Sequence, residues 1–311
     1  MFTLIQKRPY YFLISTTLIV LSVVAMVVST LTLGSPLRLS IDFTGGTLLE
    51  ATLDRSVDPE DIRALLTDEG YEDATVKTVG DDATVSIRTR ELTVAEIEAL
   101  KAVLAAAYGP LTVRSSDTVG PTVGQETTRA AVYAILAAGV AILAFVAIAF
   151  RKVPNPIRYG ACAIAKMFHD VIIMMGVCSM LGLVFNWEVD ALFLTAVVTV
   201  VGFSVQDVIV VFDRVRENSA RYRNEPYETI INRSLLETLH RSLATQLNSQ
   251  FVMLAIILFG GATIRQFMAI MLIGMVTGTY SSLFFAVPLL VVWERNEWAH
   301  IFRRRPQMST T

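Results

Sequence analysis

Apolar residues gather in six long runs along the chain, and one stretch of alternating polarity separates the first run from the rest. A run of roughly 20 apolar residues is long enough to cross a bilayer as a helix. The first run lacks the cleavage site of a removable signal peptide. The six runs cover Tyr10–Leu33, Ala130–Phe150, Ala165–Phe185, Ala191–Phe212, Leu243–Gly260 and Phe267–Trp293. This pattern predicts an α-helical polytopic membrane protein with six transmembrane helices.

Residues 35–125 alternate in polarity like strands and contain two segments of helical periodicity. Asp58 and Pro59 form a helix start, and Thr93 and Glu96 have the spacing of a capping box. The expected strands are Leu48–Asp54, Ala74–Val79, Ala83–Thr89 and Leu111–Ser115, the expected helices are Asp58–Glu69 and Thr93–Tyr108, and Gly80, Asp81 and Asp82 form the turn between the middle strands. The βαββαβ order predicts an α+β ferredoxin-like domain.

Charge separates this domain from the remainder of the chain. Residues 35–125 hold 16 acidic and 8 basic residues, whereas the other residues hold 12 acidic and 18 basic ones. The clusters of basic residues near the apolar runs fall on one side: Lys7, Arg8, Arg151, Lys152, Arg158, Arg214 through Arg241, and Arg303 to Arg305. The opposite loops carry Glu188 and Asp190 and only Arg265 as a basic residue. The positive-inside rule therefore predicts cytoplasmic termini, an extracytoplasmic domain and a multi-pass protein of the cytoplasmic membrane.

Four regions follow from these patterns. They are residues 1–34 (first transmembrane helix), 35–125 (extracytoplasmic domain), 126–295 (transmembrane helices two to six) and 296–311 (basic cytoplasmic tail). Because the tail adjoins a span, its arginines are expected to contact membrane lipid and no nucleic acid.

Few residues offer chemistry of an enzymatic kind. Cys162 and Cys178 both lie in apolar runs and are expected to be packing residues. The sequence has no metal-ligand spacing and no recognisable nucleophile beside a base. We therefore expect no enzyme activity and no cofactor, with protons as the only coupling ion.

Asp207 is the candidate that organises the rest. It lies in the segment VVGFSVQDVIVVFDRVREN, which starts as an apolar helix and ends in a charge cluster that includes Asp213. A charged Asp near the bilayer centre costs about 2.5–3.5 kcal/mol on insertion scales, so an intramembrane acid is a functional candidate. Burial favours the neutral form of a carboxyl group, which suits proton uptake and release. The alternative is a structural ion pair between helices.

Arg241 begins the fifth apolar run and is the expected counter-charge. The connection between the fourth and fifth spans is expected to pass through the cytoplasm. Asp207 and Arg241 can therefore lie at similar depth and form an ion pair. A pairing with Arg241 would hold Asp207 in its ionised form. Separation of the two residues would then let Asp207 bind a proton. Otherwise Arg241 is an anchor whose charged end reaches the membrane surface.

Lys166, His169 and Asp170 form a secondary group, with Lys166 and Asp170 one helical turn apart. They are expected at or just inside the cytoplasmic boundary, either as a proton relay or as a plain interfacial ion pair. Gly274 and Gly278 have the GxxxG spacing that permits close helix packing.

The chain resembles the SecF family of protein-export membrane proteins, in the SecD/SecF branch of the resistance-nodulation-division superfamily. Five segments carry the resemblance: IDFTGGT (Ile41 to Thr47), TVGPTVG (Thr118 to Gly124), HD (His169, Asp170), VGFSVQDVIVVFDRVREN (Val201 to Asn218) and HRSLATQ (His240 to Gln246). Asp42, Gly45, Gly46, Gly120 and Pro121 are structural positions of the first two segments. The family usually has GYSxNDT where this chain has Phe203, Gln206 and Val208.

The resemblance implies a half-transporter that pairs with SecD beside the SecYEG channel and uses the proton gradient to promote preprotein translocation. It further implies proton transfer through Asp207 opposed by Arg241, with YajC and YidC as possible accessory partners. Two alternatives stay open from the residues. One is a membrane scaffold without energy transduction, and the other is a subunit of a proton-driven efflux transporter for small molecules.

Overall fold

The computed structural model describes residues 4–79, 81–151 and 156–295. Contacts divide the chain into two compact units, one formed by the described parts of residues 1–38 and 133–311 and the other by residues 39–132. We call them the membrane unit and the outer unit and describe each by itself. The predicted tail, residues 296–311, and Gly80 of the predicted hairpin turn lie outside the described residues.

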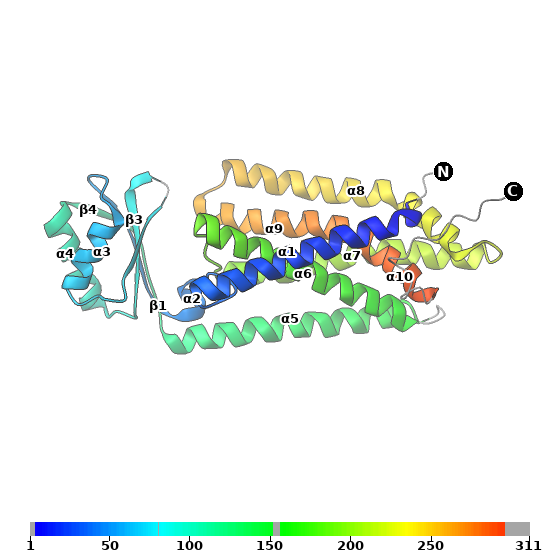
Figure 1. Cartoon of the computed structure of the whole chain (residues 1–311), viewed down its shortest axis with the longest axis horizontal. Coiled ribbons are helices and arrows are strands. Elements are labelled where there is room, and N and C mark those ends of the chain that lie inside the picture. The colour runs from blue at the N-terminus through cyan, green and yellow to red at the C-terminus, as the bar shows by residue number, and fades with distance from the viewer. Residues whose placement is uncertain (1–3, 80, 152–155, 296–311) are drawn as a thin grey trace. The chain divides into compact units, whose positions relative to one another are not determined.

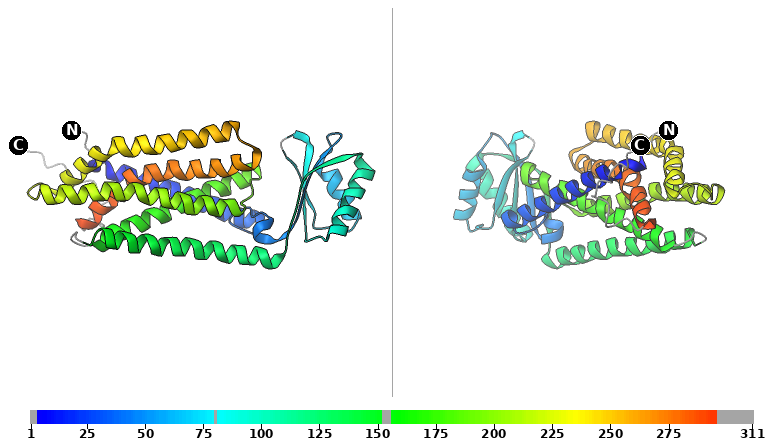
Figure 2. Two further views of the ribbon diagram at one scale, coloured as in Figure 1. Left: turned by 180° about the vertical axis from the view of Figure 1, so that it is seen from behind. Right: turned by 45° about the vertical axis from the view of Figure 1, so that its right-hand side comes forward.

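The membrane unit is built from six helices that are long and apolar enough to cross a bilayer, as predicted. They are α1 (Arg8–Leu33, preceded by the 3-10 turn Ile5–Lys7), α5 (Pro121–Ala149, of which residues 121–132 belong to the outer unit), α6 (Pro156–Phe185), α7 (Ala191–Arg221), α8 (Tyr227–Phe259) and a last span of α9 (Ala262–Ser281), a π-helical segment (Ser282–Ala286) and α10 (Val287–Glu294). Helices α6, α7 and α9 pack on one another, α1 packs on α6, and α8 packs on α7 and α9 (Figures 1 and 2).

The connection between α7 and α8 corrects one expectation. The segment from Arg214 to Arg241 was expected to be a cytoplasmic loop, but both helices continue into it and leave only residues 222–226 between them. Its charges lie on helix faces and pair there, since Arg214 contacts Glu217 at 2.6 Å and Glu237 at 2.5 Å. Charged side chains that a loop would expose to water thus form ion pairs along α7 and between α7 and α8.

Small residues set the spacing of the central helices. A Cβ atom on Gly274 of α9 would lie 2.7 Å from both methyl groups of Val200 on α7, and one on Gly278 would lie 3.4 Å from Cβ of Ser204. The predicted close packing at this GxxxG pair is therefore confirmed. A second contact was missed, because a Cβ on Gly176 of α6 would lie 2.4 Å from the Cα of Ser22 on α1.

The outer unit holds a four-stranded antiparallel sheet of order β2-β3-β1-β4. Its elements are α2 (Ile41–Thr44), β1 (Gly46–Leu53), α3 (Pro59–Asp68), β2 (Thr75–Val79), β3 (Asp81–Thr89), α4 (Val94–Tyr108) and β4 (Leu111–Val119). From β1 to β4 the order of strands and helices is the predicted one. The turn α2 was not predicted, and β4 continues four residues past Ser115. The helices cover one face of the sheet through a core that includes Leu49, Ile62, Leu66, Ile87, Leu100 and Leu104.

Both predicted helix starts are present in this unit. Asp58 accepts a hydrogen bond from the amide of Glu60, with Pro59 at the first helical position. At α4, Thr93 and Glu96 form the reciprocal capping box, with Thr93 N–H donating to Glu96 Oε2 at 2.8 Å. Hydrogen bonds from the backbone and side chain of Thr93 lower the pKa of the Glu96 carboxyl group.

The double glycine of IDFTGGT forms the bend into β1. Gly45 and Gly46 have φ angles of +75° and +117°, a region that favours glycine. A Cβ on Gly46 would lie 2.6 Å from the carbonyl oxygen of Thr89, and one on Gly45 would lie 2.9 Å from Cα of Pro121. The glycines therefore allow two backbone segments to meet here.

The second motif segment, TVGPTVG, supplies that neighbour. Pro121 begins α5 directly after Gly120, and a Cβ on Gly124 would lie 2.8 Å from the carbonyl oxygen of Phe43 in α2. Asp42 lies in the first turn of α2. The two segments thus form one packed junction within the outer unit, which is a structural role.

Candidate functional site

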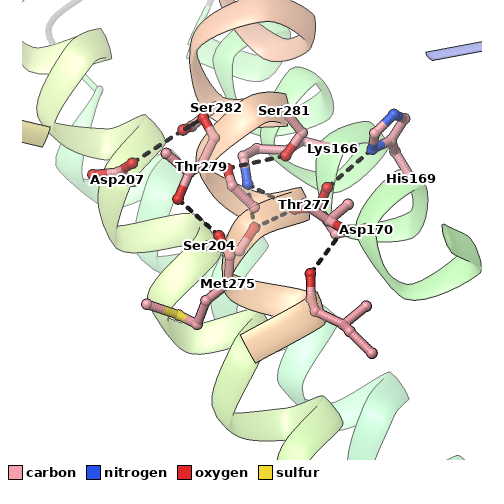
Figure 3. A network of polar contacts seen from close by, with 12 residues as sticks. Lys166, His169, Asp170, Ser204, Asp207, Met275, Thr277, Thr279, Ser281 and Ser282 are labelled. Atoms are coloured by element: carbon pink, nitrogen blue, oxygen red, sulfur yellow. Dashed lines mark hydrogen bonds and ion pairs between the residues drawn. The ribbon is translucent and has the colours of Figure 1, made fainter. Parts of the chain in front are cut away.

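Asp207 lies in the middle of α7 and is only 6% exposed. Its Oδ2 atom is 3.0 Å from the hydroxyl oxygen of Ser282, the first residue of the π-helical segment (Figure 3). The same hydroxyl lies 3.0 Å from the carbonyl oxygen of Thr279. The Asp207 carboxylate is thus tied by a hydrogen bond to the last span.

A small cavity of about 100 Å³ opens beside Asp207, between α7 and α8. It is lined by Phe203, Gln206, Asp207, Val210, Arg241, Ser242, Thr245, Gln246, Ser249 and Met275. Two of its oxygen atoms, Ser242 Oγ and Gln246 Oε1, are buried and have no hydrogen-bond partner among the described residues. Such atoms are ordinarily satisfied by water, so the cavity has the size and polarity of a hydrated chamber.

Arg241 and Asp207 line this same cavity, which agrees with the expectation that they lie at similar depth. They form no ion pair within 4.0 Å in the described part of the chain, and Arg241 is exposed. The predicted contact is therefore absent in this conformation.

The secondary group Lys166, His169 and Asp170 is buried among the helices. Lys166 is fully buried and Asp170 is 1% exposed, and Lys166 Nζ lies 2.8 Å from Asp170 Oδ2. The hydroxyl of Ser204 on α7 contacts both groups (Figure 3). Helix α6 begins ten residues before Lys166, and the group is enclosed by neighbouring helices, whereas its expected position at or just inside the cytoplasmic boundary stays a prediction.

His169 completes this group on the side away from Ser204. Its Nδ1 atom lies 2.9 Å from Asp170 Oδ1, and its ring stacks on Phe285 with centroids 4.5 Å apart. His169 is 2% exposed, and its Nε2 atom has no hydrogen-bond partner among the described residues. Both oxygens of one carboxylate thus hold a nitrogen group.

The π-helical segment Ser282–Ala286 touches both clusters. Ser282 contacts Asp207, and Phe285 three residues later stacks on His169. π-Helical turns are rare and are frequent at functional sites. On α7, Ser204 lies three residues before Asp207, which is about 4.5 Å along the helix axis. Asp207 and the Lys166 cluster are therefore neighbours at one level of the bundle.

The remaining candidates lie apart from this level. Asp213 is 56% exposed in its side chain and pairs with Arg216 at 2.7 Å, so it belongs to the surface of α7. Cys162 and Cys178 are buried free thiols, in agreement with a packing role. Within the described residues, no group of three His, Cys, Asp or Glu side chains is arranged to hold a metal ion.

Sequence reasoning missed Ser282 and the π-helical segment. A run of hydroxyl residues in an apolar span, TGTYSS from Thr277 to Ser282, was the signal that could have found them. The backbone irregularity itself has no comparable sequence signal, since SLFFA is compatible with an ordinary helix.

Comparisons with known proteins agree on one family. Residues 99–296 match the family model described as the C-terminal part of the SecD/SecF protein export membrane proteins, and residues 30–57 match the SecD/SecF GG motif. Among curated proteins, the protein translocase subunit SecF of Anaerolinea thermophila is 42% identical over 308 residues, which cover 98% of both chains. That of Thermobaculum terrenum is 44% identical over 287 residues, covering 88% of this chain and 90% of the relative.

Solved structures show the same likeness. The crystal structure of SecDF, a translocon-associated membrane protein from Thermus thermophilus, superimposes with a TM-score of 0.81 at 31% identity. The match covers 94% of this chain and 39% of that one, so this chain corresponds to a little over a third of the solved protein. A structure of SecDF in its super-membrane-facing form gives a TM-score of 0.66 at 31% identity.

Proposed function

Because the chain belongs to the SecF family of protein translocase subunits, we propose that it uses the proton gradient to promote preprotein translocation across the cytoplasmic membrane. The observation that carries the proposal is the single carboxylate of Asp207, buried in α7 beside a polar cavity. An acid inside an apolar bundle costs free energy to bury, and this cost marks Asp207 as a candidate for a transport function. Proton binding at Asp207 is the proposed coupling step.

The proposed mechanism uses Asp207 and Arg241, which line the same cavity. Proton binding removes the negative charge of Asp207, weakens its hydrogen bond with Ser282 and ends its attraction to Arg241. The packing of α7, α8 and the last span then changes. Each charge that crosses 100 mV supplies about 2.3 kcal/mol, so several protons bias a two-state element strongly.

The proposed setting follows the family. The chain would join a SecD-type subunit into a twelve-span complex beside the SecYEG channel, with YajC and YidC as accessory partners and a preprotein as cargo. Its termini would be cytoplasmic, and the outer unit would be an extracytoplasmic ferredoxin-like domain that moves with the spans. The sheet order β2-β3-β1-β4 and the βαββαβ sequence of elements support that domain type. The proposal includes no enzymatic step and no cofactor other than protons.

The decisive variant is Asp207→Asn, which keeps the size of the side chain and removes its ability to ionise. Co-purified with the SecD-type subunit, it should assemble normally and lose the part of preprotein translocation that depends on the proton gradient. The matched control is Asp213→Asn on the exposed surface of the same helix, which should retain that activity. Unimpaired translocation by Asp207→Asn would contradict the mechanism and favour a scaffold.

A further inference from the structure

The inference concerns the proton state of His169, a residue that the proposed mechanism does not use. A carboxylate only accepts hydrogen bonds, so the contact between His169 Nδ1 and Asp170 Oδ1 at 2.9 Å places the hydrogen on Nδ1. In a neutral imidazole, Nε2 then carries a lone pair. That atom is buried and has no partner among the described residues. The ring is therefore held with one unused proton-binding atom.

The other side of Asp170 is already neutralised. Lys166 Nζ is 2.8 Å from Asp170 Oδ2, and Ser204 contacts both groups. Lys166 and Asp170 together carry no net charge, so with a neutral His169 the net charge of these four buried residues is that of Asp207. Arg241, which lines the cavity beside Asp207, has an exposed side chain. A buried negative charge is costly without a positive partner.

The π-helical segment connects the two proton sites. Ser282 contacts Asp207 at 3.0 Å, and Phe285 covers the ring of His169 with centroids 4.5 Å apart. Ser282 and Phe285 belong to the same short segment. Loss of the charge on Asp207 weakens the bond to Ser282, which frees the segment that carries Phe285 to shift. Access to Nε2 of His169 is thereby linked to the state of Asp207.

We propose that His169 is a second proton-binding residue of the membrane unit and that it exchanges its proton in alternation with Asp207. In one state Asp207 is protonated and His169 is neutral. In the other, Asp207 has released its proton to water in the adjacent cavity and a proton is bound at Nε2 of His169. The O–H bond of Asp207 breaks and its proton passes to water, and water donates one proton to Nε2 of His169, where an N–H bond forms. The charges of Lys166, His169, Asp170 and Asp207 therefore sum to zero in both states. The proposal rests on the proposed function, because it adds a step to the same proton pathway.

The groups around His169 permit this assignment. Its ring stacks on Phe285 of the π-helical segment, whose first residue, Ser282, contacts Asp207. Tyr280 of α9 donates a hydrogen bond to the carbonyl oxygen of Tyr11 on α1 at 3.0 Å. On α10, Glu294 pairs with Arg158 of α6 at 2.5 Å. The elements packed against α6 carry further titratable or charged groups, which include Asp207 (α7), Tyr280 (α9), Tyr11 (α1) and Glu294 (α10), and α6 itself carries Lys166, Asp170 and Arg158.

The test uses the full chain, co-reconstituted with its SecD-type partner in proteoliposomes, and the variant His169→Gln. Glutamine can still donate to Asp170 but cannot bind a proton near neutral pH. Proton flux under an imposed gradient is measured with an enclosed pH dye between about pH 5 and pH 8, where imidazole ordinarily changes charge. Wild-type flux should vary with pH in this range. In His169→Gln the flux should fall about tenfold or more and lose that variation.

The control is His240→Gln, an exposed histidine of α8, which should leave flux and profile unchanged. Flux at the wild-type level in His169→Gln would overturn the inference. Lowered flux with an unchanged pH profile would also overturn it, because that result indicates a packing role for His169. Loss of flux in Asp207→Asn together with normal His169→Gln would refute this step alone, whereas normal flux in Asp207→Asn would refute the proposed function.

A second measurement is independent of transport. The imidazole nitrogen signals of the ¹⁵N-histidine-labelled full chain report protonation directly, and His169→Gln assigns the signal. We expect the Nε2 signal of His169 to move between the neutral and the charged position over the same pH range. A signal that stays at the neutral position throughout would overturn the inference even if flux is affected.

Discussion

The buried pair of Lys166 and Asp170 allows a quantitative test of the membrane unit. Lys166→Met removes the ammonium group but retains a long, flexible apolar side chain, so the change in packing volume is small. Asp170 then remains in place, 1% exposed, with its hydrogen bonds from His169 and Ser204. What is lost is the opposite charge 2.8 Å away.

The expected cost follows from that geometry. Two unit charges at this distance attract each other by about 6 kcal/mol for an effective dielectric constant near 20. Part of this attraction offsets the desolvation of both groups, and removal of one partner of a buried pair typically costs about 3–5 kcal/mol. Replacement of both partners leaves no unpaired charge and is typically close to neutral. The double variant Lys166→Met, Asp170→Leu should therefore be more stable than Lys166→Met alone.

The assay is unfolding of the full chain in mixed micelles with increasing SDS, followed by far-UV circular dichroism. The free energy of unfolding should fall by about 3–5 kcal/mol in Lys166→Met and should recover by about half or more in the double variant. If the single and double variants lose the same stability, the pair contributes packing alone. The electrostatic reasoning for this cluster would then be wrong.

Three further outcomes are expected. Gly274→Val should lower the free energy of unfolding by about 1–3 kcal/mol in SDS, because a Cβ at this position would lie 2.7 Å from both methyl groups of Val200. The control Gly202→Ala, which has no atom within 4 Å of the added Cβ, should leave that free energy unchanged. Gly46→Ala should loosen the pairing of β1 with β3, seen as faster amide exchange in both strands, because its Cβ would lie 2.6 Å from a carbonyl oxygen at φ +117°. The pKa of Glu96 is lowered below its ordinary 4.5 in the folded outer unit, so its stabilisation is full above that value and is lost as pH falls through the lowered pKa. The difference in melting temperature between wild-type and Glu96→Ala should accordingly be present at pH 7 and vanish in acid, and a difference that persists there would contradict the assignment.

Much of the architecture could be predicted because it depends on local pattern. Apolar length found all six spans, and the capping residues Asp58 and Thr93 marked both helix starts of the outer unit. The ends of α7 and α8 could not be found this way. The parts of α7 and α8 that extend beyond the apolar runs contact each other, as Arg214 does with Glu237, and a single sequence does not display such contacts.

In the candidate site, too, single residues could be predicted from the sequence but their contacts between helices could not. Asp207 could be predicted as a candidate because a single acid in an apolar run is recognised without any knowledge of how the helix packs. The full burial of Lys166 could not be predicted, because its partner Ser204 comes from another helix. Nor could the absence of an ion pair between Asp207 and Arg241 within the described residues be predicted, because the cavity that both residues line depends on side chains of several helices.

The sparse packing of α5 has a consequence for biosynthesis. Between Tyr133 and Ala149, Val146 is the only buried residue among those described, so neighbouring helices of this chain contribute little to holding the segment in place. Its entry into the bilayer during synthesis then depends on its own hydropathy. An arginine at the exposed position Val140 would cost about 2.5–3.5 kcal/mol at the translocon, with no adjacent helix to compensate. Such a substitution should reverse the topology of the following spans in a glycosylation-mapping assay, and would do so before any folded bundle exists.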